Sequence, residues 1–171
     1  MTGLSRVYNL GRLGQAGDSI TLDAGPEERA GLARLAGVLE VPKFFAEISL
    51  KKLSPTRFEI SYALAAEVVQ ACVVSLEPLT AAIAREFSRE LHFTPVMRRD
   101  IKEGEVVISP AEDDVPEEIE SLHYDLAGPL VEEFLLSIDP YPRKAGVEFA
   151  PPPMDKPESP FAALKDLKSG G

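Results

Sequence analysis

One stretch of alternating side chains, residues 57–74, constrains the fold of this chain more than any other feature. Charged or polar residues such as Glu59, Ser61 and Glu67 occupy its odd-numbered positions. Its even-numbered positions are apolar or aromatic: Phe58, Ile60, Tyr62, Leu64, Ala66 and Val68. A period of two is typical of a strand that buries one face. The chain is therefore expected to build a sheet, with one long strand near 57–74.

A second alternating segment precedes this strand. Phe44, Ala46, Ile48 and Leu50 alternate with more polar neighbours, and Ser54-Pro55-Thr56 between the two segments is typical of a turn. We therefore predict an antiparallel pair of strands near 43–53 and 57–74. Shorter strands are expected at 5–10 and 20–22.

Residues 79–93 fit two patterns. Four apolar positions recur every four residues, as in a helix: Leu79, Ile83, Phe87 and Leu91. The same positions with Ala81 and Phe93 are also all odd-numbered, as in a strand interrupted by Arg85 and Arg89. The residues alone leave both structures open.

Two helices are predicted. Gly25-Pro26-Glu27-Glu28 is typical of a helix start, because proline suits the first position and acids suit the positive end of the helix dipole. The apolar spacing that follows predicts a helix near 26–37. A second apolar face over residues 130–138 predicts a helix near 126–138, capped by Asp125 or Gly128, with Pro129 in its first turn.

The charge of the chain is divided unequally. Residues 1–100 hold 12 Lys+Arg and 12 Asp+Glu, whereas residues 101–171 hold 6 and 16, which gives net charges of 0 and −10. Residues 109–121 are acidic and contain prolines, and this composition predicts a mobile loop. Nucleic-acid binding over a broad surface needs a basic face, so a basic protein is the more natural partner of the second half.

Residues that could carry catalysis or bind metal are sparse. His92 and His123 lie 31 positions apart, and the spacing of His and Cys fits no metal site. Cys72 continues the apolar face of the 57–74 strand, which favours a buried, inert thiol. We predict no enzyme activity, no cofactor, no metal and no small-molecule substrate.

The start of the chain and its hydrophobic stretches bear on its location, and the C-terminal residues predict a tail. The first residues lack an apolar run after Arg6, and no stretch approaches the ~18 apolar residues of a spanning helix, so we expect a cytoplasmic protein without a membrane contact. Residues 151–171 predict a proline-rich, flexible tail, with a short helical segment that contains Phe161 and Leu164.

Three segments, in their order and spacing, carry a resemblance to a known family. They are Gln70 to Leu79 with the alternation that follows, Tyr124 to Arg143, and Phe161 to Lys165. Over roughly residues 40–168 they resemble the YceD family, the large ribosomal RNA subunit accumulation proteins of bacteria and plastids, and the last two segments resemble its alphaproteobacterial branch. The motif residues are Cys72, Leu76, Glu77, Pro78, Asp125, Leu126, Glu133, Asp139, Pro140, Pro142 and Arg143.

The resemblance implies a cytoplasmic factor needed for normal levels of large-subunit ribosomal RNA, with no established catalytic residues. It also implies that residues 79–93 form a strand. Many family members have a second cysteine three positions after the first and more cysteines after the proline-rich turn. Here Ser75 stands at the former position and no cysteine follows Pro142, so a zinc or redox role is not expected for this chain.

Together these observations predict an α+β domain over residues 1–150. Its antiparallel sheet is a meander of long strands, open or barrel-like, with two covering helices. The expected function is ribosome biogenesis through binding to a large-subunit precursor or a basic ribosomal protein, with limited rRNA contact. The alternative is an adaptor that binds another protein through its tail. The candidate partner-binding residues are Glu112, Asp113, Asp114, Glu117, Glu118, Arg85, Arg89, Arg98, Arg99, Phe161 and Leu164.

Overall fold

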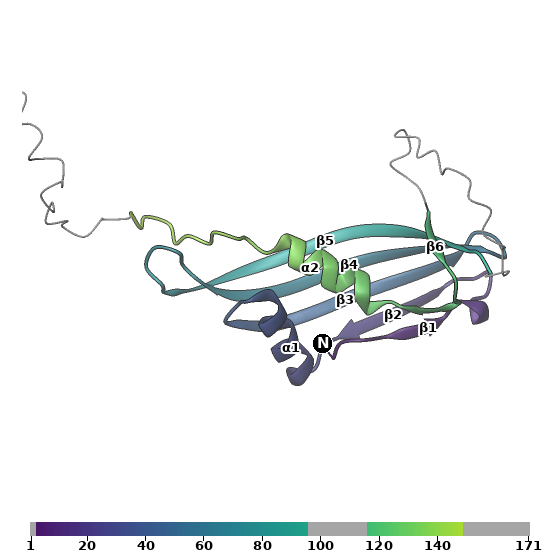
Figure 1. The fold of residues 1–171 in the computed structure, drawn as a ribbon, viewed down its shortest axis with the longest axis horizontal. Coiled ribbons are helices and arrows are strands. Elements are labelled where there is room, and N and C mark those ends of the chain that lie inside the picture. The colour runs from purple at the N-terminus through teal and green to yellow at the C-terminus, as the bar shows by residue number, and fades with distance from the viewer. Residues whose placement is uncertain (1–2, 96–115, 149–171) are drawn as a thin grey trace, which may run out of the picture.

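A mainly antiparallel five-stranded sheet is the central element of the computed structural model, which describes residues 3–95 and 116–148 (Figure 1). Its strands, in spatial order, are β2 (Asp18–Asp23), β3 (Glu40–Lys52), β4 (Arg57–Ala71), β5 (Pro78–Phe93) and β6 (Glu117–Ile119). The three long strands predicted near 43–53, 57–74 and 79–93 are confirmed, and the helical alternative for residues 79–93 is wrong. The sheet is open and does not close into a barrel.

The register of the long strands follows from their alternation. Tyr62 of β4 lies opposite Ile48 of β3 and Phe87 of β5. Beyond the register shift between Glu40 and Lys43, the even-numbered residues of β3 and β4 therefore share one face of the sheet, and all of them except Lys52 are buried. The odd-numbered residues of both strands share the opposite face, together with the even-numbered residues of β5.

Two helices cover the buried face of the sheet (Figure 1). They are α1 (Pro26–Ala36) and α2 (Ala127–Ser137), and both confirm the predicted helices. The Glu28 carboxylate accepts a hydrogen bond from the Gly25 N–H at the start of α1, over 2.8 Å. Gly37 ends α1 with a φ of 66°, a left-handed conformation that glycine adopts without strain. Gly128 lies inside α2, so of the two predicted caps only Asp125 precedes the helix.

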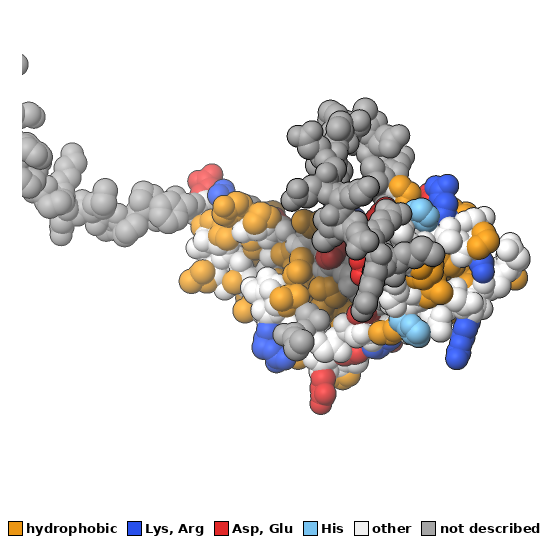
Figure 2. Space-filling model, turned by 45° about the vertical axis from the view of Figure 1, so that its right-hand side comes forward, with side chains coloured by type: hydrophobic (Ala, Val, Ile, Leu, Met, Phe, Trp, Pro, Cys, Tyr) orange, Lys and Arg blue, Asp and Glu red, His pale blue; other side chains and the backbone are white. Residues whose placement is uncertain are grey.

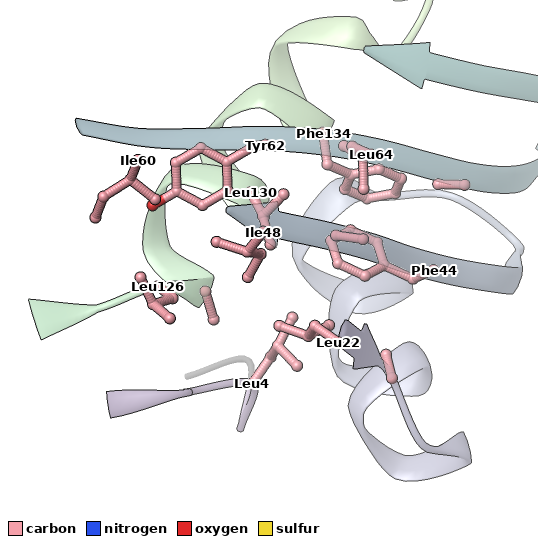
Figure 3. Close-up of a cluster of buried hydrophobic side chains, with 14 of the residues drawn as sticks. Leu4, Leu22, Phe44, Ile48, Ile60, Tyr62, Leu64, Leu126, Leu130 and Phe134 are labelled. Atoms are coloured by element: carbon pink, nitrogen blue, oxygen red, sulfur yellow. The ribbon is translucent and has the colours of Figure 1, made fainter. Parts of the chain in front are cut away.

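The core lies between this face of the sheet and the helices (Figure 3). The rings of Phe44 on β3 and Phe134 on α2 meet edge to face, with centroids 5.3 Å apart. Tyr62 stacks on Phe87 at 4.7 Å. Edge-to-face and stacked aromatic pairs contribute about 0.5–1.5 kcal/mol beyond the burial of their area. The first pair joins α2 to β3, and the second joins β4 to β5.

Two short strands form a separate small sheet. β1 (Val7–Asn9) pairs antiparallel with β7 (His123–Asp125), and the 3-10 helix η1 (Leu10–Arg12) follows β1. The strand expected at residues 5–10 therefore exists, but it does not pair with the five-stranded sheet. Residues 117–119, which we placed in the acidic loop, instead form β6, parallel to the end of β5. Neither helix of the described ranges has the length and apolar composition needed to cross a bilayer.

Candidate partner-binding site

Eight of the eleven motif residues lie in two segments that meet in space. One segment is the turn between β4 and β5, residues 72–78, and the other is the stretch after α2, residues 139–144. The N–H of Val73 donates to the carbonyl of Pro142 over 2.9 Å. The Nζ of Lys144 lies 2.6 Å from a carboxylate oxygen of Glu77. We call these two segments the hairpin-end cluster.

The thiol of Cys72 connects the two segments. Its side chain is buried, as predicted, but it lies one residue beyond the end of β4, so the strand prediction to residue 74 ran too far. Its Sγ accepts hydrogen bonds from the backbone N–H groups of Ser75 and Lys144, each over 3.4 Å. A hydrogen bond from the Ser75 side chain, and then N–H groups of Ser75, Lys144 and Val74, lower the pKa of Cys72 to about 6. Hydrogen bonds to the thiolate stabilise the charged form.

Leu76 sits at the tip of the turn in an unfavourable conformation. Its φ is 60°, and its side chain is 76% exposed. A left-handed backbone costs a residue with a Cβ about 1–2 kcal/mol. Val73 and Tyr141, on the two hydrogen-bonded segments beside it, are also exposed. We call Val73, Leu76 and Tyr141 the apolar tip.

Hydrophobic side chains gather at this end of the molecule, where residues 149–171 leave the described chain (Figure 2). Contiguous exposed apolar surface marks contact sites for other macromolecules more often than single exposed residues do. Close to the apolar tip, Lys144 and Glu77 neutralise each other, whereas the exposed Arg143 is in no ion pair with a described residue. The hairpin-end cluster therefore presents exposed apolar side chains beside the guanidinium of Arg143.

The segment after α2 is held against β4 and β5 by polar contacts. The buried side-chain amide of Gln70 donates to the carbonyl of Asp139 over 2.8 Å. The Asp139 carboxylate accepts the N–H of Tyr141 over 2.9 Å, which fixes the turn before Pro142. A hollow of about 240 Å³ lies between this segment and the start of β5, with Arg143 on its wall. The motif residues here build the shape of the cluster.

The other three motif residues lie outside the hairpin-end cluster: Asp125 ends β7, Leu126 precedes α2, and Glu133 lies on α2. A carboxylate oxygen of Asp125 accepts the N–H groups of Arg6, over 2.7 Å, and Ala127, over 3.0 Å. Leu126 is buried, and Glu133 lies 3.7 Å from Arg85. Asp125 therefore joins the start of the chain to the start of α2, which is a structural role.

The structure brings together two of the predicted partner-binding residues, Arg89 and Glu117. Arg89 pairs with Glu117 at 3.3 Å and with Glu132 at 2.6 Å, and Arg85 pairs with Glu133. Four arginines were predicted to be available for limited RNA contact, and the two described ones, Arg85 and Arg89, thus face carboxylates of the same chain. Glu118 is exposed on β6. The other predicted residues lie outside the described residues: Glu112, Asp113, Asp114, Arg98, Arg99, Phe161 and Leu164.

The histidines remain apart, His92 half-buried on β5 and His123 exposed on β7. Within residues 3–95 and 116–148, no three His, Cys, Asp or Glu side chains are grouped as metal ligands would be. Gln70 and Lys144 were not singled out from the sequence as site residues. Their contacts span up to 72 positions, and no local pattern marks such a contact.

Comparison with known proteins gives one match. The family model described as "Large ribosomal RNA subunit accumulation protein YceD" matches residues 60–168, which is more than half of the chain. The match begins within β4 and includes the whole hairpin-end cluster. No curated protein and no solved structure matches the chain significantly.

Proposed function

Because the chain belongs to the YceD family of large ribosomal RNA subunit accumulation proteins, we propose that it is a cytoplasmic ribosome-biogenesis factor that binds a precursor of the large subunit and catalyses no reaction. The family's description implies a role in the accumulation of large-subunit ribosomal RNA. The family match over residues 60–168 carries this proposal. The charge of the chain supports a basic ribosomal protein as the component that it binds.

The charge division supports a basic protein as the direct partner. Residues 101–171 have a net charge of −10, from 6 Lys+Arg and 16 Asp+Glu. A segment of this charge repels phosphate and attracts basic proteins, and attraction between opposite charges speeds association. Arg85 and Arg89 are already paired with carboxylates, so RNA contact is a minor part of the proposal.

The apolar tip supports a second contact with the same precursor. Electrostatic attraction mainly raises the association rate and orients the two partners, whereas buried apolar anchors supply most of the affinity of an interface. Leu76 is exposed and rigidly placed, since the turn that carries it is joined to residues 139–144 by the bonds of Cys72 and Val73. The partner is expected to bury it.

Sedimentation of a cell lysate through a sucrose gradient tests the proposal. The protein is expected to migrate with large-subunit precursors at low salt and to dissociate in part at moderate salt, since exposed charges are screened. Migration with free proteins at both salt concentrations would overturn the ribosomal role. Deletion of residues 150–171 distinguishes the tail-dependent adaptor, because the shortened protein should still migrate with the particles.

The acidic segment is tested with a charge-matched pair of variants. The neutral variant combines Glu112→Gln, Asp113→Asn, Asp114→Asn and Glu118→Gln. The control exchanges Asp and Glu at the same four positions and keeps the charge. Glu117 is left in place because it pairs with Arg89. The neutral variant should lose co-sedimentation while the control keeps it, and equal behaviour of the two would count against docking through acids.

A further inference from the structure

One face of the five-stranded sheet is uncovered. Both helices and the β1–β7 pair pack on the opposite, core face (Figure 1), and in the described part of the chain no helix or strand lies over the other. Antiparallel sheets commonly leave one face to water, and that face is then polar. In this protein, however, the middle of the uncovered face also carries apolar residues. Phe45, Ala65 and Ala84 form one row across β3, β4 and β5.

Two glutamates border this apolar middle. Glu47 on β3 and Glu86 on β5 both lie directly opposite Ala63 on β4. Adjacent strands are about 4.8 Å apart, so the two glutamates lie one strand on either side of Ala63, about 10 Å apart. Neither is in an ion pair with any described residue, whereas the acids nearer the β3–β4 turn are paired, Lys51 with Glu59 and Arg57 with Glu90.

The surface is also hollowed at this place. A shallow depression of about 560 Å³ is lined by residues that include Phe45, Ala65 and Ala84, with Glu47 and Glu86 on its walls. Lys43 and Arg85 also line it, and Arg85 is paired with Glu133 of α2. A second of about 380 Å³ adjoins it between Ser49, Ser61 and Ser88. Alanine is disfavoured in strands, so the alanines here add space above the sheet without adding strand stability.

The geometry points to this face as a docking site for an arginine- or lysine-rich segment of a partner protein. The long side chain of Arg or Lys combines an apolar stem with a cationic end. Its stem would lie on the floor formed by Phe45 and the alanines, and its cation would meet Glu47 or Glu86. RNA is the poorer occupant, because its phosphates would face two carboxylates that are unpaired in the described chain and only one exposed lysine there, Lys43.

This inference deepens the proposed function, since it gives the basic partner a surface on the folded domain, separate from residues 103–115. The site can be tested without any ribosomal component. The probe is a fluorescein-labelled peptide in which arginine alternates with serine, titrated into the full chain at physiological ionic strength. Backbone amide shifts in NMR spectra locate where it binds.

Shifts are expected at the exposed positions of β3, β4 and β5. The double variant Glu47→Gln/Glu86→Gln should weaken binding of the peptide about tenfold, the effect of losing one or two close charge pairs. The control Glu27→Gln/Glu120→Gln removes the same charge from two other exposed acids and should weaken binding less than about twofold, since only the long-range field changes. Ala63→Arg supplies a cation between the two glutamates and should block the site.

Equal weakening by the two double variants, or amide shifts confined to other parts of the chain, would overturn the inference. Shifts at this face with a single-stranded RNA in place of the peptide would also overturn it. Because the titration contains no ribosomal component, a negative result would exclude only this docking surface and not the proposed function. The sucrose gradient decides the proposed function separately.

Discussion

The backbone N–H of Lys144 donates to the Sγ of Cys72 over 3.4 Å, so that the thiol at the end of β4 holds a segment 72 residues further along the chain. The sulfur is a weak acceptor as a thiol and a much stronger one as a thiolate. The strength of this connection should therefore depend on pH.

The pKa of Cys72 is lowered to about 6, against an ordinary value of about 8.5 in an unfolded chain. Between these two values the folded state binds fewer protons than the unfolded state, so the free energy of unfolding should rise with pH across that window. The contribution is complete above the unfolded value and is lost as pH falls through about 6. Urea unfolding of wild type and Cys72→Ala at several pH values should give a difference that grows with pH.

Ser75→Ala serves as the control for this prediction. It keeps the thiol and removes the side-chain hydrogen bond that contributes most to the lowered pKa. The titration of the thiolate, followed by its ultraviolet absorbance, should then move to higher pH. A difference between wild type and Cys72→Ala that is the same at every pH would contradict the mechanism.

Leu76→Gly should stabilise the fold while weakening partner binding. Glycine adopts the left-handed backbone at a φ of 60° without strain, but it also makes the unfolded chain more flexible. The free energy of unfolding should therefore rise by about 0.5–1 kcal/mol. The exposed apolar side chain is lost, so less protein should migrate with large-subunit precursors. Leu76→Ala removes most of the same side chain without relieving the backbone, and should weaken binding with no gain in stability. A Gly variant less stable than wild type would rule out strain at this turn.

Tyr62→Phe should raise the free energy of unfolding. The Tyr62 hydroxyl is buried and has no hydrogen-bond partner among the described residues, and burial raises the pKa of this phenol well above its ordinary value. Burying an unpaired hydroxyl costs about 1–3 kcal/mol in proteins, part of which the substitution recovers. The ring remains to stack on Phe87. Tyr62→Leu, which loses the stacking, should be less stable than Tyr62→Phe in the same urea titration; a Phe variant no more stable than wild type would indicate a partner for the hydroxyl.

Asp125→Ala should destabilise the domain by about 1–3 kcal/mol, because two backbone N–H groups lose their acceptor. These are the N–H groups of Arg6 and Ala127. Asp125→Asn keeps an acceptor oxygen in place and should cost less. Chemical denaturation of both variants measures the difference, and equal losses would show that the charge of Asp125, not its hydrogen bonds, is what matters.

β3, β4 and both helices were predictable because one face of each is buried. Phe58 to Val68 alternate without interruption, and α1 and α2 have apolar faces and start signals in the sequence. β5 was ambiguous for a physical reason: much of it is exposed on both faces, with only Ile83 and Leu91 buried. Its apolar positions are therefore too few to separate a period of two from one of four.

The rest of the site depends on contacts between distant residues. β6 and β7 have three residues each, and such short strands exist only because β5 and β1 pair with them. The arginines of β5 were predicted to be available for RNA, but the position of α2 above them places Glu132 and Glu133 at their guanidinium groups. The family resemblance grouped Cys72 with Pro142 and Arg143, whereas nothing in the local sequence indicated Lys144 as the partner of Glu77.

The pairing of β1 with β7 has a consequence for the nascent chain. Val7 pairs with Asp125, and the Arg6 N–H that caps this pairing reaches across 119 positions. At a synthesis rate of about 5–20 residues per second, the first strand waits roughly 6–24 s for its partner to be made. Contacts of such large sequence separation also close slowly, because the entropy of a long loop must be lost first. The buried side chains of Leu4 and Leu10 therefore stay accessible to chaperones until most of the domain has been translated.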